Sequence, residues 1–205
     1  MGRRGDHTLD EIKTMAVDAA ERIVRKKGRE GLSTRKIAKE IGYTSGSLYL
    51  VFKNFEDLLM HVNGRTLERL KAELTRESSR QTDPLAAVRA ICWAYIRFAE
   101  RNQEFWSLVY EYPWESKGTR PAWYQSLIDH CFQALASRLG ELAQGKSADE
   151  ILKGSQSLWA IIHGTHHLFL SGRAQAAGLK ATDDLMDFQI DLFLRGYLGL
   201  EKVRP

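Results

Sequence analysis

Residues 33–52 read STRKIAKEIGYTSGSLYLVF, and this stretch decides the fold. Apolar residues at helical spacing lie on both sides of Gly42. The pattern predicts two helices joined by a tight turn, because glycine adopts the backbone conformations that end a helix. The helix after the turn is expected to open at Ser45 with Ser-Gly-Ser, which are weak helix formers, and to continue through bulky residues 48–52. Small residues at the front of a bulky helix indicate a tip that faces a partner.

A further helix precedes this pair. Thr8 followed by Glu11 predicts a capping box at its start, and Gly28 predicts its end. Ser33 is expected to cap the second helix. Three short helices, the last two joined by a tight turn containing glycine, are typical of a helix-turn-helix unit. Such a unit places its second helix, the recognition helix, in the major groove of DNA.

The tip of the third helix fits this role. Residues at the front of a recognition helix contact base edges, so small or polar side chains there permit close approach. Residues 45–47 meet this requirement. Leu48 and Phe52 lie one turn apart and are expected to face inward, while the Tyr49 hydroxyl is placed to reach a phosphate.

The charge of the chain is concentrated in its first quarter. Residues 1–55 carry 12 Lys/Arg against 7 Asp/Glu, whereas residues 56–205 carry 18 against 19. A basic head on a neutral body indicates an anionic partner for the head. Solvated helix faces also carry surplus Lys and Arg, so charge alone leaves both interpretations open.

The remainder of the chain shows helical periodicity and no run that alternates as a strand would. We predict an all-α protein of about nine helices: an N-terminal three-helix helix-turn-helix DNA-binding domain, 1–55, joined by a long helix to a larger C-terminal helical bundle, 56–205. The helices expected in the bundle start after Asn54 and then cover 84–102, 103–110, 121–142, 147–172 and 182–198.

Composition predicts a soluble cytoplasmic protein. Hydrophobic residues make up 43% of the chain and charged residues 27%, which is ordinary for a globular domain. The two cysteines, Cys92 and Cys131, lie in apolar helical patterns, which indicates reduced, buried thiols. There is no signal-peptide pattern, and no apolar stretch approaches the ~20 residues that cross a bilayer, so no membrane partner is expected.

The stretch 8–59 resembles the N-terminal domain of TetR-family transcriptional regulators. That family follows a first helix rich in Ala and Ile with G-x-S/T-x-x-x-I/L-A-x-x-x-G, then x-S/T-x-x-x-L-Y-x-x-F, then x-x-K-x-x-L-L. The residues at the matching positions are Gly31, Ser33, Ile37, Ala38, Gly42, Ser45, Leu48, Tyr49, Phe52, Leu58 and Leu59.

The resemblance implies a set of DNA contacts. Thr34, Arg35 and Tyr49 are expected to bind phosphates. The family's phosphate-binding Lys is replaced here by Phe55, so we assign that contact to Lys53. The residues expected to face bases are Ser45, Gly46, Ser47 and Leu50.

The body is rich in aromatic residues, most of which are expected to be core. A pocket between helices is the usual ligand site in an all-α body, and TetR-like proteins bind a small molecule in this domain. We predict an effector that is apolar or aromatic. The residues expected to line its pocket are Trp93, Phe98, Phe105, Trp106, Tyr110, Trp123, Trp159 and His163.

The last two long helices carry wide apolar faces, and the segment 158–173 resembles the Trp-(few)-His-Gly signature of one TetR subgroup. In the family these helices pair with their copies in a homodimer. The residues expected at that interface are Leu158, Ile162, His166, Leu170, Phe188, Leu192 and Phe193. A two-fold dimer places its recognition helices about 34–36 Å apart, which is one turn of DNA.

His163, His166 and His167 are the only histidine cluster, and no acidic residue or cysteine lies within a turn of them, so we expect no metal and no cofactor. No catalytic motif is present, and no enzyme is expected. The sequence therefore predicts a DNA-binding transcriptional regulator, a ligand-released repressor that binds a near-palindromic operator as a dimer. The alternatives are a helical protein–protein adaptor with a basic head and a transcriptional activator of the same fold.

Overall fold

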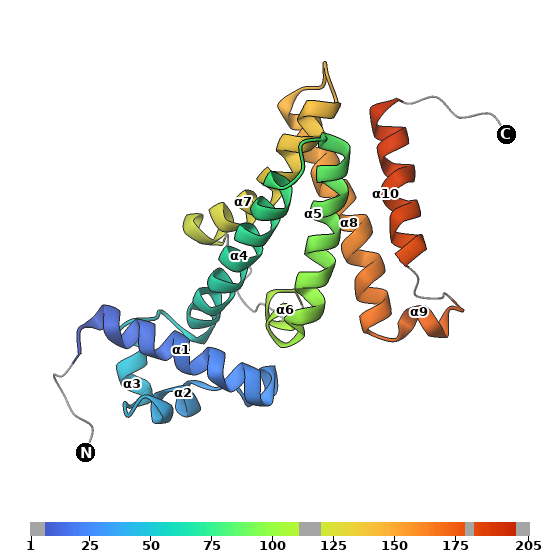
Figure 1. Ribbon diagram of the computed structural model, residues 1–205. Helices are drawn as coiled ribbons and strands as arrows, with labels where there is room; N and C mark the ends of the chain where they lie inside the picture. Colours follow the sequence, from blue (N-terminus) through green and yellow to red (C-terminus); the bar gives the residue numbers. More distant parts are fainter. Residues whose placement is uncertain (1–6, 111–119, 179–182, 200–205) are drawn as a thin grey trace. The chain divides into compact units, whose positions relative to one another are not determined.

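The computed structural model describes residues 7–110, 120–178 and 183–199 (Figure 1). Within these ranges the secondary structure is helical and contains no strand, which confirms the all-α prediction. The chain divides into two compact units. Unit 1 comprises Met1–Arg69 and Arg101–Leu127, and unit 2 comprises Leu70–Glu100 and Ile128–Pro205. The boundaries of these units differ from those of the predicted domains 1–55 and 56–205. Unit 1 also contains residues 56–69 and 101–127, because α6 (Gln103–Tyr110) and the start of α4 (Phe55–Ser79) pack on the N-terminal helices.

The first helix of unit 1, α1 (Leu9–Lys27), begins and ends where local sequence predicts. The Glu11 N–H donates to Thr8 Oγ1 over 3.2 Å, and the Thr8 N–H donates to Glu11 Oε2 over 2.6 Å. These two bonds satisfy backbone donors that a helix start otherwise leaves unpaired. Gly28, with φ at +62°, ends the helix. The predicted capping box is therefore confirmed.

The helix-turn-helix region follows a short 3-10 helix, η1 (Arg29–Gly31), and consists of α2 (Thr34–Glu40) and α3 (Ser45–Leu48). Ser33 caps α2, as predicted, through a bond from the Lys36 N–H to Ser33 Oγ. Helix α3 begins at Ser45, as predicted, but Ser45 is not its cap. Thr44 is the cap, because its Oγ1 accepts the Ser47 N–H over 3.2 Å, and regular helix ends at Leu48 rather than running to residue 52.

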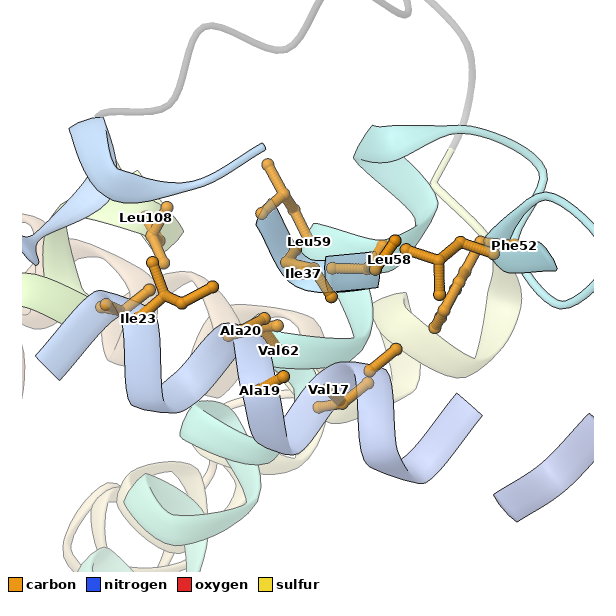
Figure 2. Packing of buried hydrophobic residues seen from close by; sticks show 14 of the residues in the cluster. Val17, Ala19, Ala20, Ile23, Ile37, Phe52, Leu58, Leu59, Val62 and Leu108 are labelled. Carbon is orange, nitrogen blue, oxygen red and sulfur yellow. The ribbon is translucent and has the colours of Figure 1, made fainter. Parts of the chain in front are cut away.

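Two further helices complete the core of unit 1. The first turns of α4 (Phe55–Ser79) and the whole of α6 (Gln103–Tyr110) contribute apolar side chains to those of α1, α2 and α3. Figure 2 shows these side chains gathered between the helices. Leu48 and Phe52 are both buried in this core, which confirms their predicted inward orientation. The largest side chains in it are Val24, Ile37, Leu48, Phe52, Leu58, Leu59, Val62, Phe105 and Leu108.

An ion-pair network joins α1 to α4. Glu21 is almost fully buried, and its carboxylate lies 2.8 Å from an Arg69 guanidinium nitrogen and 3.5 Å from Arg65. Arg65 also pairs with Asp18. Because Arg65 and Arg69 remain partly exposed, they can recover hydration when the acid is removed, whereas the buried acid depends on both.

The network should contribute to stability through Glu21. We expect Glu21→Gln to lower the free energy of unfolding by about 1–2 kcal/mol, because a buried neutral amide cannot replace the charge-assisted bonds between the Glu21 carboxylate and the two arginines. Glu40→Gln is the matched control, since it breaks the more exposed Arg22–Glu40 pair and should cost at most about 0.5 kcal/mol. Urea denaturation of the full chain measures both. Equal losses for the two variants would contradict the assignment.

Unit 2 is built from α5 (Pro84–Arg101), α7 (Ala122–Leu142), α8 (Ala148–Leu170), α9 (Arg173–Ala176), α10 (Asp183–Leu198) and the end of α4. The sequence prediction has one helix over 147–172 and no helix after it before residue 182, so it lacks α9. Helices α8 and α10 lie side by side (Figure 1). Gly154 permits a close approach, because a Cβ there would lie 2.6 Å from the Tyr197 ring.

Polar contacts fix α10 on α5 and α8. Trp93 Nε1 donates to Asp187 Oδ1 over 2.8 Å, and Arg89 pairs with Asp191. Thr165 Oγ1 donates to Gln189 Oε1 over 3.0 Å. These contacts hold one face of α10 against unit 2, so the opposite face is the one left exposed.

Candidate functional site

The surface around α2 and α3 holds every residue predicted to touch DNA, and all of them belong to unit 1. Thr34 lies in the first turn of α2, and its hydroxyl lies 3.4 Å from that of Tyr49, which follows α3. Tyr49 is 53% exposed although its neighbour Leu48 is buried. Core packing of Leu48 therefore presents the Tyr49 ring outward, beside the start of α2.

The residues predicted to face bases form the tip of α3. Gly46 and Leu50 are exposed, Leu50 at 72%, while Ser45 and Ser47 are half-buried. The nearest atom to a Cβ placed on Gly46 is Thr44 Oγ1 at 3.6 Å, an ordinary contact. Nothing within the chain thus requires a glycine at this position, which fits a need for clearance toward an outside partner.

The cap of α3 engages one of these predicted base contacts. Thr44 Oγ1 lies 3.0 Å from Ser47 Oγ, in addition to accepting the Ser47 N–H. Ser47 is therefore held in place by Thr44, a residue that sequence reasoning missed. The sequence offered no signal that selects Thr44, since Thr44 and Ser45 are both preferred cap residues.

Cations surround this tip. Arg35 and Lys53 are exposed, with Lys36 and Lys39 also exposed on α2. The Lys53 backbone N–H donates to Asp57 Oδ2 over 2.9 Å, which fixes the backbone from which its side chain extends. Phe55, which replaces the family's lysine, packs against the core of unit 1 and offers no charge to a phosphate.

The N-terminal end of α1 is tied to the turn between α2 and α3. His7 Nδ1 lies 2.9 Å from the Tyr43 hydroxyl, a contact that sequence reasoning did not anticipate. The pair is separated by 36 residues, so no local pattern could have found it. It places His7 next to the turn between α2 and α3.

This arrangement of α1–α3 is that of a helix-turn-helix unit, and comparison with protein families agrees. Residues 16–62 match bacterial regulatory proteins of the tetR family. Residues 88–193, more than half of the chain, match the tetracyclin repressor-like C-terminal domain. The chain belongs to the TetR family. It is accordingly a transcription regulator that binds DNA rather than an enzyme, as the sequence predicted.

Related proteins share the fold of this TetR-family chain. A protein of unknown function from Rhodococcus sp. RHA1 superposes with a TM-score of 0.72 at 21% identity, covering 95% of this chain and 98% of that one. The fatty acid degradation regulator FadR from Bacillus halodurans gives a TM-score of 0.63 at 15% identity, covering 98% and 100%. The fatty acid metabolism regulator protein of Bacillus subtilis (strain 168) is 33% identical over 76 residues, which span 35% of this chain and 39% of that protein.

The residues predicted to line an effector pocket are divided between the units. Unit 1 holds Phe105, Trp106, Tyr110 and Trp123; unit 2 holds Trp93, Phe98, Trp159 and His163. Phe105 is part of the hydrophobic core of unit 1. Within unit 2, Phe98 is buried, and the Trp93 indole is bonded to Asp187.

One aromatic cluster of unit 2 contains Trp159 and His163, two of the residues predicted to line the pocket. Trp159 stacks on His163 with ring centroids 5.0 Å apart, and Phe132 meets Trp159 edge-on at 5.6 Å. His163 Nδ1 lies 2.8 Å from the Tyr95 hydroxyl. The cluster therefore combines apolar ring faces with one hydrogen-bonding imidazole, the composition that small-molecule sites favour.

His163 should make stability sensitive to acid. Burial, and then the neighbouring His167 and His166, lower the pKa of His163 to about 4 from 6.5. Between these two values the unfolded chain binds a proton that the folded chain does not. Stability is therefore present in full above pH 6.5 and is lost as the pH falls to about 4, by about 1–2 kcal/mol after allowance for partial exposure.

Urea denaturation across this pH range measures the effect. His163→Asn should remove that part of the acid sensitivity, whereas His130→Asn, at an exposed position on α7, should leave the wild-type pH profile in place. An unchanged profile in His163→Asn would show that other groups cause the sensitivity.

The residues predicted at a dimer interface separate into two groups. Leu158, Ile162 and His166 are buried inside unit 2 of the single chain. The exposed ones are Leu170, Phe188 at 62% and Leu192 at 61%, with Phe193 half-buried. The apolar faces of α8 and α10 are wider than the packing between the two helices requires.

Two further features concern metals and membranes. Among residues 7–110, 120–178 and 183–199, no three His, Cys, Asp or Glu side chains are placed to hold a metal ion. His163 and His167 stack with centroids 6.1 Å apart, and His166 is buried on another side of α8. In the same part of the chain, no helix combines the length and the apolar character that crossing a bilayer requires.

Proposed function

We propose that this TetR-family regulator is a repressor that binds a near-palindromic operator as a homodimer and leaves it when a small molecule binds the helical body. The observation that carries the proposal is the tip of α3, where Gly46 and Leu50 are exposed while Leu48 anchors the helix in the core of unit 1. A tip with no side chain longer than serine before Leu48 can approach a base edge, and its flanking cations can bind phosphates.

Phosphate binding rests on Thr34, Arg35, Tyr49 and Lys53. Thr34 and Tyr49 form a hydroxyl pair, and Arg35 in α2 and Lys53 after α3 are exposed cations. The tip itself offers only the hydroxyls of Ser45 and Ser47 for base edges, and hydroxyls accept several bases. Specificity then depends on DNA shape and on the spacing of two half-sites.

The dimer is supported by the free faces of α8 and α10. Phe188 and Leu192 lie one turn apart, and Leu168 and Leu170 are also exposed. Among the described residues, no atom lies within 4 Å of a Cβ placed on Gly164 of α8 or Gly196 of α10, so no contact in that part of the chain explains these glycines. Helical glycines beside exposed apolar residues permit a second copy to approach closely, and contiguous apolar patches mark such interfaces.

An apolar effector is the class that the body favours, since ring faces dominate the cluster around Trp159. Two similar proteins are named as regulators of fatty acid metabolism or degradation. Fatty acids are therefore the first effectors to test. Ligand binding would favour one of two dimer geometries and so change the spacing of the recognition helices.

The experiment is selection of genomic DNA fragments by the purified protein, followed by gel shifts across a salt series. Two-fold symmetric fragments bound with an affinity that falls steeply with salt are expected, because phosphate contacts release counterions. Failure to select any DNA would favour the adaptor alternative. Fatty acids added to the complex should release it; a tightened complex would favour an activator instead.

A further inference from the structure

The first turn of α7 carries a tryptophan that lies on the helix-turn-helix side of unit 1. The Trp123 ring stacks on His61 of α4, with ring centroids 4.6 Å apart and planes 8° from parallel. Trp123 nevertheless remains 39% exposed. The two residues are 62 positions apart, so α7 reaches the DNA-binding unit through this contact.

Gly64 makes room for the stack. A Cβ at Gly64 would lie 3.1 Å from Trp123 Cζ3 and 3.3 Å from Leu127 Cδ1, closer than side chains normally pack. Glycine inside a helix costs about 1 kcal/mol relative to alanine. A mid-helix glycine at this point of α4 is therefore explained by the close approach of α7.

Two further contacts connect this stack to α3, the recognition helix. On its other side His61 meets Phe52, with ring centroids 5.7 Å apart. Phe52 is buried, and its N–H donates to the Leu48 carbonyl over 2.9 Å, so it is bonded to the last residue of α3. Figure 2 shows Phe52 at the edge of the core, beside Leu58. A continuous series of contacts thus runs from Trp123 through His61 and Phe52 to α3.

The surroundings of His61 favour its neutral form, so that the contacts between the three rings involve no charged imidazole. Burial, together with the Lys13 ammonium and the Arg65 guanidinium, lowers the pKa of His61, and the Asp57 carboxylate opposes this shift. The imidazole is then neutral at physiological pH and stacks as a ring. Two surface hollows meet at the stack, one lined by Tyr49 and Lys53 and the other by Gly64. Open space on both sides leaves the Trp123 ring room to shift.

We propose that Trp123 is a positioning residue for DNA binding. Through its stack on His61, the first turn of α7 sets the position of α3, the recognition helix. Helix α7 has residues in both units, so a displacement of its later turns is transmitted to Trp123 along a continuous helix. The inference rests on the proposed function, in which an effector bound in the body alters DNA binding, and it identifies the contact that conveys the change.

The first test uses the full-length protein and a DNA fragment selected by the wild type. Trp123→Ala should weaken DNA binding about tenfold. An aromatic pair contributes up to about 1.4 kcal/mol, which corresponds to a tenfold change in affinity. The salt dependence should stay as in the wild type, because no phosphate contact is lost. Trp123→Phe should restore binding. Leu85→Ala removes a comparably exposed apolar side chain of unit 2, at 37% exposure, and should leave ligand-free affinity unchanged.

The second test separates positioning from stability. Gly64→Ala favours the helix yet presses on Trp123, so it should weaken DNA binding without lowering the urea midpoint. In the double variant Gly64→Ala/Trp123→Ala, the clash with the Trp123 ring is gone and only the contact with the end of the Leu127 side chain remains, so alanine at 64 should add little further loss. Losses that simply add, or that follow the urea midpoint, would overturn the inference. A wild type that selects no DNA would instead refute the proposed function.

Discussion

Replacing Tyr49 with alanine should reduce operator affinity by about 100-fold or more while the chain keeps its fold. A hydrogen bond to a charged group contributes about 1.5–3 kcal/mol, and a two-fold dimer loses the contact in both half-sites, so the two losses multiply. Tyr49 is 53% exposed, and its removal should change the free energy of unfolding by less than about 0.5 kcal/mol. Gel shifts and urea denaturation measure the two quantities.

Two variants refine this prediction. Tyr49→Phe keeps the ring and removes the hydroxyl that lies 3.4 Å from Thr34, so most of the loss should persist if the hydroxyl binds phosphate. Arg35→Ala should also reduce operator affinity by about 100-fold or more and, by removing a cation from each half-site, reduce the slope of log affinity against log salt by about 1.8. Undiminished binding by both alanine variants would refute the assigned surface.

Placing a carboxylate at Leu192 should separate the dimer. Leu192 is 61% exposed in the single chain and lies one turn from Phe188, so aspartate is tolerated in the monomer. In a two-fold interface the same substitution buries two unpaired charges close together, which costs several kcal/mol. We expect Leu192→Asp to raise the dimer dissociation constant by about 100-fold or more, with a comparable loss of operator binding.

Sedimentation at micromolar concentration measures this effect. Leu85→Asp is the matched control, because Leu85 is an exposed leucine of unit 2 in the first turn of α5, where an acidic side chain is compatible with the helix dipole. That variant should sediment like the wild type. If Leu192→Asp remains a dimer, the interface lies on another surface.

The outcome at the recognition turn shows how far sequence reasoning extends. The helix-turn-helix unit, the buried Leu48 and Phe52 and the outward Tyr49 follow from periodicity, because a 3.6-residue repeat places residues four apart on one face. The identity of the cap did not follow. Thr44 and Ser45 are both good capping residues, and only the path of the backbone out of the turn decides between them.

The apolar residues of the body illustrate the opposite limit. Leu158 and Leu192 belong to similar helical patterns, yet Leu158 is fully buried and Leu192 is largely exposed. Periodicity states that a helix has an apolar face but not which neighbour covers it. Likewise Phe105 and Trp159 look alike in the sequence, but the first packs in the core of unit 1 and the second stacks on His163.

The sequence by itself determined the class of fold, most helix ends and the position of the DNA-binding unit, because these depend on hydrogen bonds and side chains within one or two turns. Capping boxes at Thr8 and Ser147 are of this kind. Only the tertiary structure decided that Glu21 pairs with Arg65 and Arg69, and that Trp123 stacks on His61 over Gly64. Those contacts join residues more than forty positions apart, and they exist because whole helices pack together, which no local pattern records.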